Sequence, residues 1–256
     1  MTTHDIQQNL VLAKLYWAWG YMPHLEVKVI HPEASAPRRY ELTDIDVYGV
    51  RATLDFSMER LVGDCKTLKN VSPINRAFWL KGIMEYLRVH RGYLVLRTSR
   101  PITEDHKLSA KAMGITLMSE DDFRVFQSKL LPEDFPRGMM LFREESWRYF
   151  EGNIANISFL KQLNEYRMYR YWLDPPSRAL RHSLLKTRSV RESIDPRQKF
   201  QRALALDMVT LFSIAFLDML CHLFHIYLIP KRKTDIDAYL KAYVYGGREY
   251  LSLIHI

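Results

Sequence analysis

The pattern of apolar and polar positions differs between the two halves of the chain. In the first half, segments with every second residue apolar, typical of strands, alternate with segments in which apolar residues recur every three or four positions, typical of helices. We predict helices over residues 10–19, 74–89 and 102–114, and strands over residues 24–30, 40–50, 60–68, 92–99 and 115–119. The order α-β-β-β-α-β-α-β predicts an α/β fold.

Local signals place the ends of several of these elements. Ser72-Pro73 is typical of a helix start and Gly92 of a helix end. Thr103 is predicted to cap the third helix and Gly114 to end it. A turn over residues 55–59 joins the second and third strands, which makes them candidates for pairing.

Beyond Phe126 the sequence has helical periodicity, interrupted by prolines and without a clear strand pattern. We therefore predict two parts, a domain over residues 1–125 and a mostly α-helical, basic region over residues 126–250. The segment Met208–Pro230 is nearly long and apolar enough to cross a bilayer. Because Asp218 stands at its centre, with His222 and His225 one turn further on, a buried helix is favoured over a membrane span.

Composition describes a folded protein with an affinity for polyanions. The 256 residues are 48% hydrophobic and carry a formal net charge of +8. The excess of positive charge is concentrated between Lys161 and Arg202, where eleven Lys or Arg residues face four Asp or Glu residues. Such a run is either a nucleic-acid contact or simply a solvated surface.

Cysteine usage and the N-terminus both favour the cytoplasm. The chain has two cysteines, Cys65 and Cys221, which indicate neither a disulfide framework nor a zinc cluster. The first twenty residues have the pattern of an amphipathic helix and lack the pattern of a signal peptide.

Candidate chemistry lies on the second and third strands. Because side chains alternate across a strand, Asp44 and Asp46 share one face, and Asp64 and Lys66 share a face of the next strand. If the strands pair, Asp46 and Asp64 can bind one divalent cation, with the backbone carbonyl of Cys65 as a third ligand. The set suits Mg²⁺, with Mn²⁺ as a substitute, and Lys66 would orient the attacking water or stabilise negative charge.

The segments TDIDVYG, GDCK and AKAMGITLMSEDDF together resemble the PD-(D/E)xK nuclease superfamily, in its Mrr-like restriction endonuclease branch. The resemblance covers residues 1–123 and implies a restriction-endonuclease-like αβββαβ core. It also implies a metal-dependent DNA endonuclease with Asp46 and Asp64 as metal ligands and Lys66 as the catalytic lysine. Asp44, which shares a strand face with Asp46, would lie beside them. Gln7 and Gln8 stand in the first helix where some members have a metal-binding Glu, which leaves the number of metal ions open.

Two other interpretations stay open at this point. The chain could be a catalytically inactive nuclease-fold module for nucleic-acid binding or assembly, or the two carboxylates and Lys66 could be a surface ion pair. A homodimer would suit a site that makes one cut at a time in a duplex. The sequence indicates no small-molecule cofactor.

Further features of the second half give weaker predictions. Asp218, His222 and His225 have a spacing that permits a metal site on one helix face, although a core role is favoured. The segment Tyr166–Trp172 interleaves arginines with aromatic residues, which suits either base stacking or a packed helix. The basic residues predicted to contact nucleic acid are Arg167, Arg170, Arg178, Arg181, Lys186, Arg188 and Arg191.

The last six residues, Leu251–Ile256, raise a separate hypothesis. In reverse translation they match the end of a transposon adapter used in sequencing. We therefore expect residues 251–256 to be adapter read-through, with the natural reading frame continuing past Tyr250 in different residues.

Overall fold

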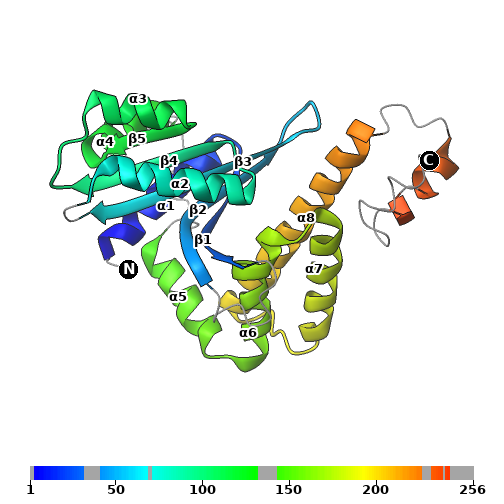
Figure 1. Cartoon of the computed structure of the whole chain (residues 1–256). Coiled ribbons are helices and arrows are strands. Elements are labelled where there is room, and N and C mark those ends of the chain that lie inside the picture. Colours follow the sequence, from blue (N-terminus) through cyan, green and yellow to red (C-terminus); the bar gives the residue numbers. More distant parts are fainter. Residues whose placement is uncertain are drawn as a thin grey trace. The chain divides into compact units, whose positions relative to one another are not determined.

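The computed structural model describes residues 3–31, 41–68, 71–131, 143–226, 232–238 and 240–242. It has a mixed α/β fold with a five-stranded sheet and helices (Figure 1). The chain divides into two compact units, one formed by Met1–Arg51 and Glu59–Tyr149 and the other by Ala52–Met58 and Phe150–Ile256. The predicted division at residue 125/126 lies inside the helix α4 (Glu120–Leu130). Residues 251–256, the predicted read-through, lie outside the described residues.

The sheet of the first unit has the strand order β1-β2-β3-β4-β5. β1 and β2 are antiparallel, whereas β3, β4 and β5 run parallel to one another. The predicted order of the first eight elements is confirmed, from α1 to β5. Their bounds are α1 Thr3–Ala18, β1 Met22–Ile30, β2 Glu41–Ala52, β3 Met58–Leu68, α2 Pro73–Leu87, β4 Arg91–Thr98, α3 Glu104–Ala112 and β5 Ile115–Ser119.

Helices α1 and α2 cover opposite faces of this sheet. Leu12 and Tyr16 of α1 are buried in one core cluster with Val47 of β2 and Cys65 of β3. Since side chains alternate along a strand, the residues preceding Val47 and Cys65 point to the opposite face. That is the face covered by α2, and the two residues are Asp46 and Asp64.

Gly63 allows α1 to approach β3 closely. A Cβ atom added at this position would lie 2.3 Å from Leu12 Cδ2 and 2.9 Å from the Tyr16 hydroxyl. Because Gly63, the neighbour of Asp64, has no side chain, Leu12 and Tyr16 of α1 can pack closely against β3.

Helix α2 ends earlier than the sequence predicted. Pro73 stands in its first turn as expected, but the helix stops at Leu87, and Arg88 takes the left-handed conformation usually given to glycine. The prediction that Gly92 ends the helix was wrong. Gly92 lies in β4, where an added Cβ would come within 2.8 Å of Met84 Sδ, so its role is close packing of α2 on the sheet.

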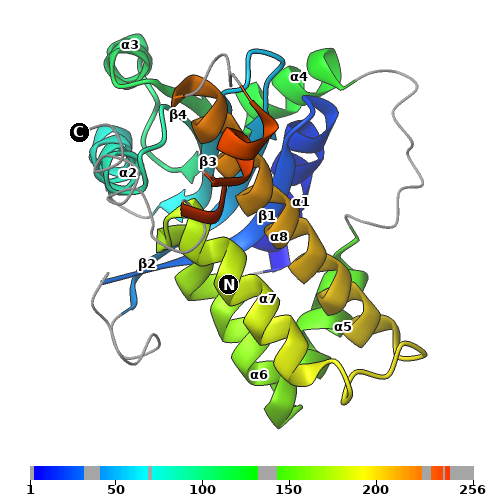
Figure 2. The ribbon, with the colours of Figure 1, turned by 90° about the vertical axis from the view of Figure 1, so that its right-hand side faces the viewer.

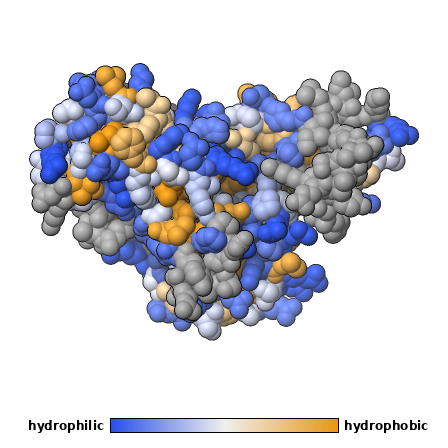
Figure 3. All heavy atoms as spheres, viewed as in Figure 1, coloured by the Kyte–Doolittle hydropathy of each residue, from blue (hydrophilic) through white to orange (hydrophobic). Residues whose placement is uncertain are grey.

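The predicted ends of α3 are confirmed. The Thr103 hydroxyl accepts a hydrogen bond from the His106 backbone N–H, and Gly114 follows the helix with a φ of +78°. Ser119 caps helix α4 in a capping box, in which its hydroxyl accepts from the Asp122 N–H and the Asp122 side chain accepts from the Ser119 N–H. Phe78, Leu108 and Val125 of α2, α3 and α4 are exposed, and Figure 3 shows apolar surface among hydrophilic surface in this part of the molecule.

Between residues 143 and 226 every element is helical, as predicted. α5 (Glu144–Ala155) and α6 (Ser158–Glu165) precede a π-helical turn over Tyr166–Arg170 and a 3-10 turn over Tyr171–Leu173. Helices α7 (Pro176–Val190) and α8 (Lys199–Ile226) then pack side by side (Figures 1 and 2).

Helix α8 is long and apolar enough to cross a membrane by length and composition alone, which a core helix of a soluble protein can also be. Its residues Met208 and Leu211 are buried, whereas Leu206, Val209 and Phe216 are exposed. The predicted buried helix is thus half covered in this structure. Pro230, the end of the predicted apolar segment, lies outside the described residues.

Candidate active site

Asp46, Asp64 and Lys66 meet on the α2 face of the sheet. β2 and β3 are hydrogen-bonded neighbours, joined by a turn in which the Thr53 N–H donates to the Ser57 carbonyl. The Lys66 ammonium lies 3.2 Å from Asp46 Oδ1 and 4.0 Å from Asp64 Oδ1. The whole residues are 0% exposed for Asp46 and 1% for Asp64. The three residues predicted to carry the chemistry are therefore together, and the interpretation as a surface ion pair does not fit their burial.

Each of the four carboxylate oxygens of Asp46 and Asp64 has a donor from the protein. Asp46 Oδ2 accepts from the Cys65 backbone N–H at 2.8 Å, and Oδ1 accepts from Lys66. Arg76 of α2 donates to both oxygens of Asp64, through Nε at 2.7 Å and Nη2 at 2.6 Å. This pairing makes the burial of two neighbouring carboxylates tolerable.

Burial and repulsion together change how the site holds protons. Burial and the neighbouring Asp64 raise the pKa of Asp46 from 3.8 to about 7, against the opposing effects of Lys66 and the Cys65 N–H. Burial lowers the pKa of Lys66, but the charges of Asp46 and Asp64 outweigh that effect and raise it. The lysine is therefore a stable cation at neutral pH, and Asp46 is the group whose charge changes there.

The raised pKa of Asp46 predicts a pH-dependent stability in the absence of divalent cations. Its pKa in the folded state, about 7, exceeds the ordinary value of 3.8 that applies in the unfolded chain, so between these pH values only the folded state holds the proton. Stability is therefore lost as pH rises through this window. Asp46→Asn removes the titration, and its free energy of unfolding relative to wild type should rise between pH 4 and pH 7 by on the order of 4 kcal/mol.

Urea denaturation in EDTA at several pH values measures this difference. Asp121→Asn is the control, since the Asp121 side chain is 91% exposed and lies on α4 rather than on the strands of the site. A stability difference between Asp46→Asn and wild type that does not change with pH would contradict the assignment.

Asp44 lies beside the two buried carboxylates, as predicted. Its carboxylate is 3.9 Å from the Lys28 ammonium, which also pairs with Glu41 at 3.2 Å. Its charge raises the pKa of both Asp46 and Lys66. Asp44 thus adds negative potential to the site from its rim.

The donor set fits Mg²⁺ by its chemistry. Asp46 and Asp64 supply hard oxygen ligands, and Mg²⁺ commonly takes one or two carboxylates and keeps water molecules as its other ligands. Among the described residues no cluster of three or more His, Cys, Asp or Glu side chains is arranged to hold a metal. Asp218, His222 and His225 are among the residues described, so they form no such cluster. The Cys65 carbonyl as a third ligand stays a prediction.

Arg76 is the site residue that sequence reasoning missed. It lies in the first turns of α2, where the positive end of the helix dipole disfavours a cation. The available sequence signal was a basic residue at the start of the helix that follows the strand carrying Asp64 and Lys66. Arg76 also stacks on the Trp79 ring, 3.4 Å from its centroid.

The side chains of α1 that the structure describes, from Ile6 to Ala18, include no carboxylate. Gln7 donates to Glu144 at 3.2 Å. Gln8 is buried, and neither polar atom of its side chain has a hydrogen-bond partner. Among the described side chains, two carboxylates contact Lys66, a set that would suit a single divalent cation.

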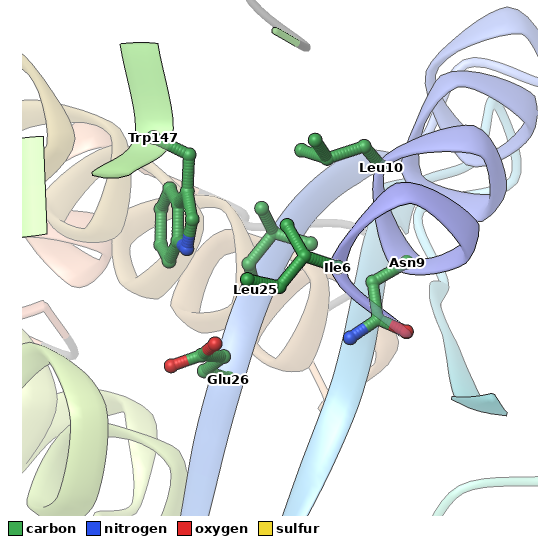
Figure 4. Close-up of a pocket in the computed structure, with 6 residues that line it drawn as sticks. All are labelled: Ile6, Asn9, Leu10, Leu25, Glu26 and Trp147. Atoms are coloured by element: carbon green, nitrogen blue, oxygen red, sulfur yellow. The ribbon is translucent and has the colours of Figure 1, made fainter. Parts of the chain in front are cut away.

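Two hollows elsewhere in the first unit are weaker candidates. A cavity of about 10 Å³ lies between α1, β1 and α5. Figure 4 shows the residues that line it, Ile6, Asn9, Leu10, Leu25, Glu26 and Trp147. It has room for one water molecule, which could reach the unpaired Asn9 Oδ1. An open hollow of about 270 Å³ lies at the start of β4 and β5, beside Arg91 and Lys111. Neither contains paired carboxylates.

Most of the predicted nucleic-acid contacts lie on or before α7, in the second unit. Arg178, Arg181 and Arg188 are exposed, and Lys186 is half-buried. Arg170, Arg178 and His182 surround Asp174, whose side chain is 2% exposed, and His182 Nδ1 lies 2.8 Å from its carboxylate. Arg191 pairs with Glu192 at 3.3 Å.

Arg167 differs from these residues because it is 1% exposed. Its guanidinium pairs with Glu151, with Asp207 at 3.3 Å and with Asn164 at 2.6 Å. Tyr166, Tyr169 and Tyr171 are also buried, so Tyr166–Trp172 forms core rather than a surface for base stacking. The prediction that Arg167 contacts nucleic acid does not fit this burial.

Comparisons of the chain with protein-family models, with curated proteins and with solved structures found no match.

Proposed function

We propose that this chain is a Mg²⁺-dependent DNA endonuclease whose first unit is a restriction-endonuclease-like core of the PD-(D/E)xK type. The observation that carries the proposal is the pair of buried carboxylates, Asp46 and Asp64, on neighbouring strands with one lysine in contact with both. The element order from α1 to β4, with a mixed sheet, agrees with the αβββαβ core that the sequence resemblance implies.

Each residue has a defined part in this proposal. Asp46 and Asp64 bind the cation, and the Cys65 N–H and Lys66 hold the Asp46 carboxylate in place. When bound, Mg²⁺ polarises the phosphodiester and lowers the pKa of a water molecule. The Lys66 ammonium stabilises the negative charge that develops on the attacked phosphate. A cytoplasmic location and a homodimer belong to the same proposal.

Plasmid cleavage tests the proposed activity. Purified chain should nick or linearise plasmid DNA with Mg²⁺ or Mn²⁺ and leave it intact with EDTA. Asp64→Asn, prepared in parallel, should not cleave, whereas equal cleavage by this variant would identify a contaminating nuclease. Intact DNA binding without cleavage by the wild-type chain would favour the alternative, a nuclease-fold binding or assembly module.

The exposed cations of α7 are assigned to DNA backbone contact in this proposal. Three exposed arginines, Arg178, Arg181 and Arg188, lie within one helix of fifteen residues. Each phosphate contact that is removed should reduce the slope of log affinity against log salt by about one. Arg181→Ala should show this in fluorescence anisotropy titrations, with Arg232→Ala as the control because Arg232 is not part of α7 and pairs with Asp235. An unchanged slope would exclude Arg181.

A further inference from the structure

Arg76 closes the candidate metal site in a specific way. Its guanidinium occupies both oxygens of Asp64, at 2.6 Å and 2.7 Å, in the bidentate geometry that binds carboxylates most tightly. The Trp79 ring stacks against the same guanidinium and holds it in this position. A cation that approaches Asp64 therefore meets a carboxylate whose oxygens are already engaged.

The charges around Asp46 and Asp64 also disfavour binding of a divalent cation. Asp46 and Asp64 carry two negative charges when ionised, and Lys66 and Arg76 carry two positive charges in contact with them. A site that is neutral in this way attracts a divalent cation weakly. Binding of the divalent cation therefore requires one of two further changes. Either Lys66 or Arg76 leaves its carboxylate, or an anion binds at the same time.

Arg76 is better suited to move than Lys66. Among the described residues Arg76 forms an ion pair with Asp64 and comes from α2, whereas Lys66 lies on β3 itself and contacts both carboxylates; the two side chains are similarly exposed, at 20% and 27%. A guanidinium released from a carboxylate needs another anion, since a partly buried, unpaired charge is costly. A phosphodiester offers the same paired oxygens and matches the guanidinium equally well.

We propose that Arg76 is an exchangeable counter-ion, which holds Asp64 when the cation is absent and transfers to a DNA phosphate when the cation binds. The proposal rests on the proposed nuclease function and adds a coupling between its two ligands. Metal binding frees Arg76 for the phosphate, and the phosphate removes Arg76 from Asp64. The two ligands therefore bind cooperatively, and each raises the affinity for the other by the same factor.

Direct binding of Mn²⁺ to the free chain tests the first half of this proposal. Arg76→Gln should bind Mn²⁺ about tenfold more tightly than wild type, because the variant removes both the competitor and one positive charge. Electron paramagnetic resonance measures the free Mn²⁺ in the titration. The matched control is Lys81→Gln, on the same helix, whose ammonium pairs with Glu85 at 2.6 Å, and it should bind as wild type does.

Binding of DNA tests the second half. Fluorescence anisotropy of a labelled duplex is measured with and without Ca²⁺, which supports binding without requiring cleavage. Ca²⁺ should raise the DNA affinity of wild type and of Lys81→Gln by about tenfold, and that of Arg76→Gln by only about twofold. Loss of the Ca²⁺ effect in the variant is the signature of coupling through Arg76.

Trp79→Leu keeps the test decisive if Arg76→Gln does not fold, which thermal unfolding would reveal. It removes the ring but leaves the guanidinium and Asp64 in place, so Mn²⁺ should bind about threefold more tightly than to wild type. If folded Arg76→Gln binds Mn²⁺ with the affinity of wild type, the proposal is overturned. If Arg76→Gln does not fold, the same result for Trp79→Leu overturns it. If wild type still cleaves DNA in that case, the nuclease function stands; absence of both Mn²⁺ binding and cleavage would overturn both.

Discussion

Replacing Lys66 by methionine should lower the rate of DNA cleavage on the order of a thousandfold. Two effects act in the same direction. The variant lacks the ammonium that would stabilise charge on the attacked phosphate. It also leaves Asp46 and Asp64 without the cation that contacts both of them, so that mutual repulsion raises the pKa of Asp46 above its value of about 7. A larger share of Asp46 is then protonated at neutral pH and unable to bind the metal.

Single-turnover cleavage of a defined duplex, measured from pH 6 to pH 9, separates these two effects. Part of the lost activity should return at high pH, where Asp46 ionises, and the remainder should not. Lys28→Met is the matched control, because Lys28 lies on β1 and pairs with Glu41 and Asp44 at the rim of the site. Lys66→Met cleaving at the rate of Lys28→Met would contradict the catalytic assignment of Lys66.

Replacing Arg167 by alanine should cost the second unit about 3–5 kcal/mol of unfolding free energy. Arg167 is the largest fully buried side chain in the described residues, and it neutralises Glu151 and Asp207. It also packs over the Phe150 ring, with the guanidinium carbon 4.9 Å from the centroid. Truncation leaves a cavity and two carboxylates without their common cation.

Urea denaturation followed by helical circular dichroism measures this loss. Arg188→Ala, which removes an exposed arginine of α7, should change the free energy of unfolding by no more than about 0.5 kcal/mol. Combining Arg167→Met with Glu151→Gln and Asp207→Asn should recover part of the loss, since no charge is then left unpaired. A cost below about 1 kcal/mol for Arg167→Ala would show that the ion pairs contribute little.

The sequence predicted the first unit well because its signals are local. Alternation and helical spacing are properties of short segments, and they gave the order of elements from α1 to β5. The same alternation placed Asp46 and Asp64 on one face, since two residues on neighbouring strands need only correct pairing to meet. The short turn between β2 and β3 supplied that pairing.

The predictions that failed depend on contacts between distant residues. Gly92 has the usual signature of a helix end, but its role is set by Met84 packing against β4. Arg76 reaches Asp64 only because α2 folds back over the sheet, which no local pattern describes. Arg167 belongs to a basic run, yet Glu151 and Asp207, sixteen and forty residues away, draw it into the interior.

The saturation of Asp46 and Asp64 by donors from the protein has an evolutionary consequence. Replacing Asp64 would leave the Arg76 guanidinium without its partner inside the fold, so selection for folding alone would preserve that pair. Asp46 differs, because its raised pKa makes its ionised form costly to the fold at neutral pH. In related chains, retention of Asp64 and Arg76 would therefore record the inheritance of a stable core, whereas retention of Asp46 would record selection for the activity proposed for the site.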